Sequence, residues 1–259
     1  MVNLMFFWFK MIKEISSTQN PIIKDVMLSK TKKGALSLNA CFIETEKVIK
    51  DCLNSNLEVL QILIETKKQQ KFADIINKYK NKVSLVSESV SKKLSETNTP
   101  SGIYALVELP KQTEFNFKNK FLVLDSLQDP TNLGAIIRSA VAFGYTQIIC
   151  INGVFPYLSK VIRSSMGYVF KISFLTVDYL DLCKLKETHG FKLISANLNG
   201  TNLNNFKPQE SFGLVIGNEG NGVSPMVQSL CDYTVTIPMQ NNVESLNASI
   251  SASILMYNL

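Results

Sequence analysis

The stretch LDSLQDPTNLGAIIRSAVAFG, residues 124–144, decides the fold predicted for this chain. An apolar strand ends in a turn rich in Asp, Pro and Asn, and a helix follows. Turns of this kind lie at the carboxyl edge of a parallel sheet, where ligands usually bind. Gly134 permits a close approach at the start of the helix, and Arg138 lies on its second turn. This pattern alone occurs in many α/β proteins, so the surrounding sequence has to decide its meaning.

After residue 120, apolar runs recur at regular spacing and alternate with helical patterns. Runs that are apolar throughout are typical of buried parallel strands, and their alternation with helices indicates a mostly parallel sheet covered on both faces. The predicted strands are residues 121–127, 147–151, 172–177, 191–197, 212–216 and 234–238, and the predicted helices are residues 132–143, 178–189 and 247–258. We therefore expect residues 121–259 to form one α/β domain.

The N-terminal half predicts a second, smaller α/β unit over residues 11–109. Its predicted helices are residues 20–29, 45–55, 69–79 and 88–94, and its predicted strands are residues 57–64, 82–86 and 103–109. Asn20 is expected to cap the first helix, with Pro21 at the first helical position. Residues 110–120 (PKQTEFNFKNK) break the pattern and are predicted to be a linker. Residues 1–10 are apolar and precede a second methionine, so we expect an extension outside the fold.

Composition is that of a soluble globular protein, with 46% hydrophobic and 19% charged residues among 259. No apolar run reaches transmembrane length, and five scattered cysteines with one histidine, His189, argue against a Cys/His metal site or a disulfide framework. We expect a cytoplasmic protein with no metal and no membrane partner. Residues 1–110 carry a net charge of +5 out of the total of +6. This excess is compatible with a phosphate-rich partner, and equally with a lysine-rich solubilising surface.

A glycine-rich loop, LVIGNEGNGVSP at residues 214–225, follows a predicted buried strand. Its glycines allow the main chain to press against a ligand. The loop lacks the GK[ST] ending of a P-loop and the GxGxxG spacing of a dinucleotide site. Without further context it could equally be a plain glycine-rich turn.

The third informative stretch is TIPMQNNVESLNASISASILMY, residues 236–257. A strand closes, a polar loop follows, and Asn247 is well placed to cap a helix. Small residues alternate with apolar ones along that helix, so it can pack very closely against another element.

Arginine is almost absent, because only Arg138 and Arg163 occur among 27 basic residues. The planar guanidinium binds phosphate through paired donors in a way that Lys cannot reproduce. For either residue alone, a surface arginine without a function is an equal alternative.

In their order and spacing, DPTNLGAIIRSAVAFG, IGNEGNGVSP and IPMQNNVESLNASISA resemble the three signature motifs of the SpoU/TrmH branch of the SPOUT methyltransferases. The resemblance covers residue 121 to the C-terminus. EISSTQNPIIKDV, FIETEKVIKD and LSETNTPSGIYALV are similar to the substrate-binding domain, with a ribosomal-protein-like α/β fold, that is fused to many members. Two departures concern this domain: Glu44-Thr45 stands where the family usually has Glu-Gly, and Lys32-Lys33-Gly34-Ala35 replaces a basic Tyr-Arg-type patch.

The resemblance implies a C-terminal SPOUT domain with a trefoil knot, residues 121–259, behind an RNA substrate-binding domain, residues 11–109. It implies a homodimer through the C-terminal domain, with the active site built across the interface. The implied reaction is methylation of an RNA ribose 2′-hydroxyl by S-adenosylmethionine without a metal, with a guanosine of large-subunit rRNA as the leading target.

By the same resemblance, the cofactor would lie against Gly217, Asn218, Glu219, Gly220, Ile237, Met239, Leu246 and Asn247. The implied catalytic positions are Arg138, Asn132, Glu219, Ser245 and Asn247. Arg138 would lie at the 2′-hydroxyl, either as general base or as a stabiliser of the developing alkoxide. The second role is chemically safer, because guanidinium stays protonated in proteins.

Three alternatives stay open on the sequence. The RNA could be tRNA, or the protein could bind RNA without catalysis on the same fold. A nucleotide-binding enzyme such as a dehydrogenase or kinase is the third, and the missing phosphate-binding fingerprints count against it.

Overall fold

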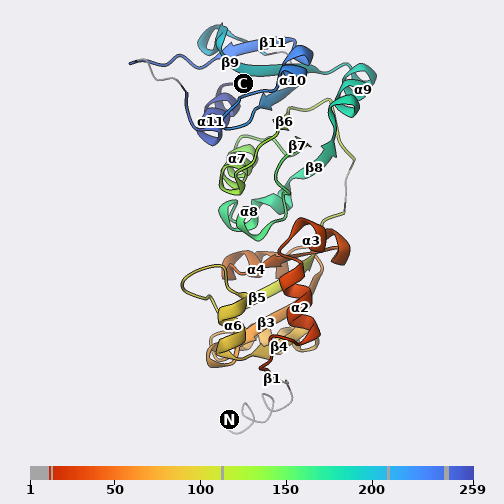
Figure 1. Cartoon of the computed structure of the whole chain (residues 1–259), viewed down its shortest axis with the longest axis vertical. Helices are drawn as coiled ribbons and strands as arrows, with labels where there is room; N and C mark the ends of the chain where they lie inside the picture. The colour runs from red at the N-terminus through yellow and green to blue at the C-terminus, as the bar shows by residue number, and fades with distance from the viewer. Residues whose placement is uncertain (1–11, 13, 112–113, 209–210, 242–244) are drawn as a thin grey trace. The chain divides into compact units, whose positions relative to one another are not determined.

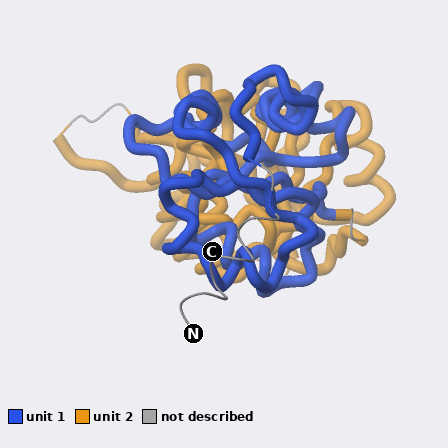
Figure 2. Tube along the Cα trace, turned by 90° about the horizontal axis from the view of Figure 1, so that it is seen from below, with its two compact units in different colours: residues 1–110, 157–159 blue, residues 111–156, 160–259 orange. Residues whose placement is uncertain are grey.

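A computed structural model describes residues 12, 14–111, 114–208, 211–241 and 245–259. The extension predicted at residues 1–10 lies outside the described residues. The chain divides into two compact units, coloured separately in Figure 2. Unit 1 comprises residues 1–110 with 157–159, and unit 2 comprises residues 111–156 with 160–259.

Unit 1 is built on a five-stranded mixed sheet with the order β1-β4-β3-β5-β2 (Figure 1). Strand β3 pairs in parallel with β4 and antiparallel with β5. The strands are β1 (Glu14–Ile15), β2 (Ala40–Ile43), β3 (Val59–Glu65), β4 (Val83–Val86) and β5 (Ile103–Glu108), and the α-helices are α2 (Pro21–Leu28), α3 (Lys32–Leu38), α4 (Glu46–Leu53), α5 (Ala73–Lys78) and α6 (Glu88–Leu94).

Helices α2, α3 and α6 of unit 1 each begin at a residue whose side chain caps the helix. The Asn20 side chain accepts a hydrogen bond from the Ile22 backbone N–H, with Pro21 at the first helical position, so that prediction is confirmed. Helix α3 and strand β2 were absent from the predicted elements. A β-carbon on Gly34 would lie 2.0 Å from the Leu28 carbonyl oxygen, so a glycine at this position lets α3 pack closely on the end of α2. Helical periodicity does not reveal such a contact in seven residues.

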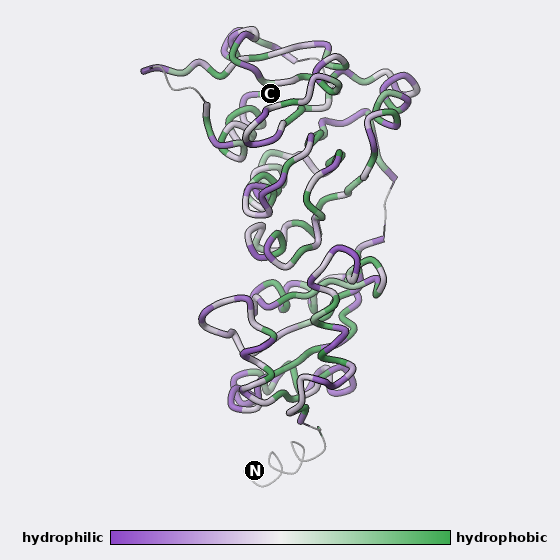
Figure 3. The backbone as a smooth tube through the Cα atoms, in the orientation of Figure 1, coloured by the Kyte–Doolittle hydropathy of each residue, from purple (hydrophilic) through white to green (hydrophobic). Residues whose placement is uncertain are grey.

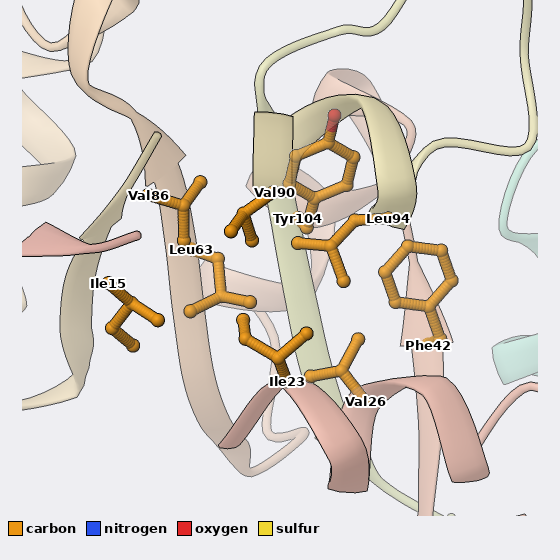
Figure 4. Packing of buried hydrophobic residues seen from close by; sticks show 9 residues of the cluster. All are labelled: Ile15, Ile23, Val26, Phe42, Leu63, Val86, Val90, Leu94 and Tyr104. Atoms are coloured by element: carbon orange, nitrogen blue, oxygen red, sulfur yellow. The ribbon is translucent and has the colours of Figure 1, made fainter. Parts of the chain in front are cut away.

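The core of unit 1 lies between α2, α6 and one face of the sheet (Figure 4). The rings of Phe42 and Tyr104 stack with centroids 6.0 Å apart. Hydrophobic sequence is concentrated on the strands of both units in Figure 3, as burial of the sheet requires. The cluster consists of Ile15, Ile23, Val26, Phe42, Leu63, Val86, Val90, Leu94 and Tyr104.

Unit 2 contains a six-stranded, all-parallel sheet with the order β11-β9-β10-β6-β7-β8, which confirms the predicted α/β class. Its strands are β6 (Phe121–Asp125), β7 (Gln147–Ile151), β8 (Ser173–Val177), β9 (Lys192–Asn202), β10 (Phe212–Ile216) and β11 (Tyr233–Thr236). Its α-helices are α7 (Pro130–Ala142), α8 (Ser159–Ser164), α9 (Tyr179–His189), α10 (Pro225–Leu230) and α11 (Ala248–Asn258).

Part of the segment predicted as a linker packs against the core of unit 2. Phe115 and Phe117 pack on each other at 4.8 Å between centroids, and both meet Phe121 edge-on. Phe117 also stacks on Phe191 at 5.2 Å. These aromatic side chains therefore tie residues 115–120 to the sheet that follows them.

Helix α11 packs along α7 and reaches β10. The trefoil knot implied by the resemblance stays a prediction for this C-terminal region. Over the described part of the chain, no helix is both long enough and apolar enough to cross a membrane.

Candidate active site

A hollow of about 340 Å³ opens beside α11, at the carboxyl ends of β10 and β11 and along the middle of β9. Figure 1 labels these elements. The carboxyl edge is the one at which parallel sheets bind ligands. The loops of the second and third sequence stretches meet here. Its lining comprises Ala196, Asn197, Leu198, Val215, Ile216, Gly217, Asn218, Glu219, Gly220, Asn221, Gly222, Val223, Thr236, Ile237, Met239, Ser245, Leu246, Ala248, Ser251 and Leu255.

Most residues predicted to touch the cofactor line this hollow. Asn247 is outside the lining and caps α11, because its Oδ1 accepts the Ser249 backbone N–H at 2.9 Å. The predicted residues in the lining are Gly217, Asn218, Glu219, Gly220, Ile237, Met239 and Leu246.

The glycine-rich loop after β10 folds around the Asn218 side chain. Asn218 Oδ1 accepts the backbone N–H groups of Gly220 at 2.9 Å and Asn221 at 3.1 Å. A β-carbon on Gly217 would lie 2.1 Å from the carbonyl carbon of Gly222, and Gly222 has a φ of +66°. Gly217 is thus required because the loop closes on itself, a reason that differs from the predicted contact with a ligand.

Glu219 joins this loop to the other two sequence stretches. Its Oε1 accepts the Asp129 backbone N–H at 3.0 Å and the Asn132 side-chain amide at 3.1 Å. The Asn247 amide donates to Asn132 Oδ1 at 3.0 Å. A continuous chain of hydrogen bonds therefore links Glu219, Asn132 and Asn247, which are far apart in sequence.

The Glu219 carboxyl has its pKa held below the ordinary range. Burial acts to raise this pKa, but hydrogen bonds from the Asn132 side chain and from backbone N–H groups, including those of Asp129 and Gln128, together outweigh it. Glu219 is therefore an ionised acceptor at neutral pH, able to fix the orientation of the Asn132 amide.

Arg138 and Ser245 occupy different surroundings. Ser245 borders the hollow. Arg138 is exposed on α7 and is not part of the lining; among the described residues no hydrogen bond or ion pair involves its guanidinium. Within one chain, the structure brings together Asn132, Glu219, Ser245 and Asn247 but leaves Arg138 outside the hollow.

Asp125 and Ser126 are site residues that sequence reasoning missed. Asp125 ends β6 at 2% exposure, and its Oδ2 accepts the Ser224 backbone N–H at 2.7 Å. Ser126 adopts a φ of +58°, and its carbonyl accepts the Asn218 amide at 2.9 Å. Together they clamp both ends of the glycine-rich loop. The signal for Asp125 in the sequence is a carboxylate at the end of an otherwise apolar strand.

The β9 residues Ala196, Asn197 and Leu198 were also missed as lining residues. They precede an irregularity where the pairing shifts from Ser195↔Thr234 to Thr201↔Val235. Their position at the carboxyl end of a predicted parallel strand was the signal for them.

Other reactive side chains lie apart from the hollow. Burial raises the pKa of the Cys52 and Cys150 thiols to about 12, so neither is a nucleophile at neutral pH. His189 stacks on Phe117 at 4.2 Å. Over the described residues, no group of three or more His, Cys, Asp and Glu side chains could hold a metal ion.

Comparison with known proteins identifies both units. The model of the SpoU rRNA Methylase family matches residues 119–257, more than half of the chain, and that of the MRM3-like substrate binding domain matches residues 10–105. The 23S rRNA (guanosine(2553)-2′-O)-methyltransferase RlmP of Bacillus subtilis is 31% identical over 252 residues, covering 96% of this chain and 99% of that protein.

Solved structures share the fold over nearly the whole chain. The crystal structure of an RNA 2′-O ribose methyltransferase matches with a TM-score of 0.78 at 30% identity, covering 95% of this chain and 97% of that one. An AdoMet-bound rRNA methyltransferase from Sinorhizobium meliloti matches with a TM-score of 0.82 at 23% identity, with the same two coverages, which shows the shared fold.

These matches confirm the resemblance read from the three motifs, and with it the enzyme class. They overturn the alternatives of a dehydrogenase or kinase and of a non-catalytic RNA-binding protein. The chain belongs to the SpoU rRNA methylase family of S-adenosylmethionine-dependent RNA ribose 2′-O-methyltransferases, with an MRM3-like substrate-binding domain at its N-terminal side.

Proposed function

We propose that this chain methylates the ribose 2′-hydroxyl of a guanosine in 23S-type rRNA. The observation that carries the proposal is the hydrogen-bonded chain Glu219–Asn132–Asn247, which unites three sequence stretches beside one hollow. The named target of the Bacillus subtilis relative supports guanosine and the large subunit. Residues 11–109 would bind the RNA, and residues 121–259 would catalyse methyl transfer. Residues 110–120 would connect these two domains. The location proposed with this substrate is the cytoplasm.

The hollow fits S-adenosylmethionine in size and in lining. Its volume of about 340 Å³ lies in the range of roughly 300–1,000 Å³ typical of small-molecule sites. Apolar side chains of Ile237, Met239 and Leu246 can cover a flat base, and the loop at residues 217–222 offers polar main chain. When bound, this cofactor supplies a methyl group on a positively charged sulfur.

The protein's own contribution is orientation and electrostatic stabilisation. Ionised Glu219 fixes the Asn132 amide, and Asn132 in turn fixes Asn247 at the start of α11. Such preorganised groups need no rearrangement during the reaction. We assign Arg138 to stabilising the developing 2′-alkoxide and clamping the neighbouring phosphate, because its guanidinium stays protonated.

A homodimer explains why Arg138 lies outside the hollow of its own chain. Arg138 shares an outer face of α7 with Ala135 and Ala142, whose small side chains permit close approach of another helix. Large apolar side chains are exposed on α11, with Ile250 at 52% and Tyr257 at 74%. We assign this α7–α11 surface to the dimer interface, across which Arg138 enters the partner's hollow.

The target is tested by incubating the protein with radiolabelled S-adenosylmethionine and separate pools of unmodified 23S-type rRNA and tRNA. We expect label in rRNA, mapping to the ribose of one guanosine. Label in tRNA alone would show that tRNA, and not rRNA, is the substrate. Label on a base would show that the protein does not methylate ribose.

Sharing of the site between subunits is tested by mixing two inactive variants, Arg138→Ala and Asn247→Ala. If Arg138 acts in the partner's hollow, each mixed dimer regains one complete site. Random mixing then restores about a quarter of the native activity, since half of the dimers are mixed and each has one working site of two. No recovery after verified subunit exchange would place Arg138 in its own chain's site.

A further inference from the structure

Asp125 is a buried carboxylate to which the proposed function gives no role. It ends β6 at 2% exposure. Its Oδ2 accepts the Ser224 backbone N–H at 2.7 Å, and its Oδ1 accepts the Ser126 hydroxyl at 3.1 Å. Both oxygens accept a hydrogen bond, as the oxygens of an ionised carboxylate do. These two hydrogen bonds hold the side chain in one orientation.

Lysine side chains neutralise other aspartates of unit 2 but not this one. Asp232 pairs with Lys186 at 2.5 Å and with Lys192 at 3.0 Å. Over the described residues, no ion pair involves Asp125, and its hydrogen bonds come from uncharged donors. Water is nearly excluded from a side chain at 2% exposure, so its charge is screened less than a charge on the surface. Asp125 therefore leaves a negative charge inside unit 2 that no cation of the protein balances.

Asp125 lies next to residues that line the hollow. Strand β6 pairs with β10 in register as far as Ile216, so Asp125 follows beside Gly217 on the neighbouring strand. Neighbouring strands of a sheet lie about 4.8 Å apart. Its partner Ser224 follows Val223 in the chain, and both Gly217 and Val223 line the hollow. The carboxylate therefore lies behind the part of the wall that these two residues form.

The lining itself carries negative charge and no positive charge. Over the described residues, Glu219 is its one ionisable side chain, and Lys, Arg and His are absent from it. Two carboxylates therefore act on this space, Glu219 at its border and Asp125 behind its wall. A fixed negative potential of this kind favours a cationic occupant over a neutral one of the same shape.

We propose that Asp125 makes the hollow select the positively charged cofactor over its demethylated product. This inference rests on the proposed function, because it takes the hollow as the S-adenosylmethionine site. Methyl transfer breaks the bond between the methyl carbon and sulfur and forms a bond between that carbon and the ribose oxygen. The electron pair of the broken bond stays on sulfur, which becomes uncharged, and the 2′-proton leaves to solvent. Attraction to Asp125 therefore acts on the cofactor before transfer and ends after it, which favours release of S-adenosylhomocysteine.

The test is calorimetric titration of the full-length protein with S-adenosylmethionine, S-adenosylhomocysteine and sinefungin. In sinefungin, a carbon bearing an ammonium group replaces the methylated sulfur, so this ligand is also cationic. The variant is Asp125→Asn, which has nearly the same shape and keeps an oxygen acceptor for the Ser224 N–H. We expect the preference for each cationic ligand over S-adenosylhomocysteine to fall about tenfold. Glu65→Gln is the matched control, because it removes a carboxylate of 6% exposure from a strand end of unit 1, and its preferences should be native.

The ratio of affinities separates a charge effect from a merely structural one. Equal weakening of all three ligands in Asp125→Asn would show that Asp125 only holds the glycine-rich loop, and unchanged affinities would show that its charge does not act on the hollow. Either result would overturn the proposal.

The native protein supplies a second measurement that does not depend on folding of the variant. It should bind sinefungin more tightly than S-adenosylhomocysteine, because the two ligands differ in charge at the position of the sulfur. Equal or weaker binding of sinefungin would overturn the proposal while the cofactor site stands. Failure of the proposed function has a different result, since the native protein would then bind none of the three ligands or methylate no RNA ribose.

Discussion

Each unit contains a glutamate at or just after the end of a strand, but the two carboxylates serve different purposes. Glu65 ends β3 at 6% exposure, and its Oε2 accepts the Ser91 hydroxyl at 2.7 Å. The Tyr104 hydroxyl donates to the Ser91 carbonyl at 2.9 Å, which completes a sealed network. Glu219 follows β10 and binds Asn132 in a comparable way, yet it borders an open hollow.

The two carboxylates differ in whether a space large enough for a ligand lies beside their hydrogen-bonded network. Glu65, Ser91 and Tyr104 satisfy one another where water is excluded, so their hydrogen bonds stabilise the fold. Glu219 and Asn132 are equally ordered but have a small-molecule-sized space beside them. A preorganised site requires side chains that are already held in place and a space beside them for the ligand. Four substitutions would break or sharpen this comparison.

The largest effect is expected from Gly217→Val. Its side chain would overlap the Gly222 backbone, so the glycine-rich loop cannot close and cofactor binding should be lost entirely. Calorimetric titration with S-adenosylmethionine measures this. Gly220→Ala is the matched control for loop closure alone, because its β-carbon would meet only Asn218 Oδ1 at 3.6 Å and the loop can still close. Native affinity in Gly217→Val would show that the loop does not form the cofactor site.

Arg138→Lys is expected to have the second-largest effect, a loss of catalytic rate. It keeps the charge but loses the planar pair of donors, and loss of such a stabilising group costs about 10²–10³ in kcat. Cofactor affinity should stay within about twofold, because Arg138 is assigned to the 2′-alkoxide and the neighbouring phosphate of the RNA and not to the cofactor. Single-turnover kinetics with saturating RNA measure the chemical step. Turnover close to native would remove Arg138 from the mechanism.

Glu219→Gln should lower kcat/KM about tenfold, since hydrogen bonds to a charged group contribute roughly 1.5 kcal/mol. Because the folded pKa of Glu219 lies below its ordinary value, its stabilising contribution is complete above that ordinary value and is lost as the pH falls through the folded pKa. Because ionised Glu219 orders the loop that lines the hollow, cofactor affinity of the native protein should also weaken as the pH falls below the ordinary glutamate pKa and through the lower folded pKa. The Gln variant should lack this decline, and an identical pH profile in both proteins would contradict the assignment.

Glu65→Ala should have the smallest effect on catalysis and a clear effect on stability. Removing the acceptor of the Ser91 hydroxyl should destabilise the protein by about 1–3 kcal/mol. Urea denaturation followed by circular dichroism measures the loss, and cofactor affinity should be unchanged. Weakened cofactor binding at unaltered stability would reverse the roles given to the two carboxylates.

The amino-acid sequence by itself determined the α/β class, the mostly parallel sheet of unit 2 and the family. Fully apolar runs between helical patterns require a sheet covered on both faces, and local capping signals such as Asn20-Pro21 and Asn247 act within one turn of chain. Most of the residues that the family resemblance implies for the cofactor line one hollow, because loops after parallel strands gather at one edge.

Only the tertiary structure decided how those loops are held and which face Arg138 takes. The clamp by Asp125 and Ser126, the closure of Gly217 on Gly222 and the link from Glu219 through Asn132 to Asn247 join residues up to 115 positions apart. Likewise, α3 packs closely on α2 because Gly34 fits against Leu28, and Phe115 and Phe117 pack against the core of unit 2. Periodicity reports neighbours along one element, whereas these contacts depend on which distant element arrives beside it.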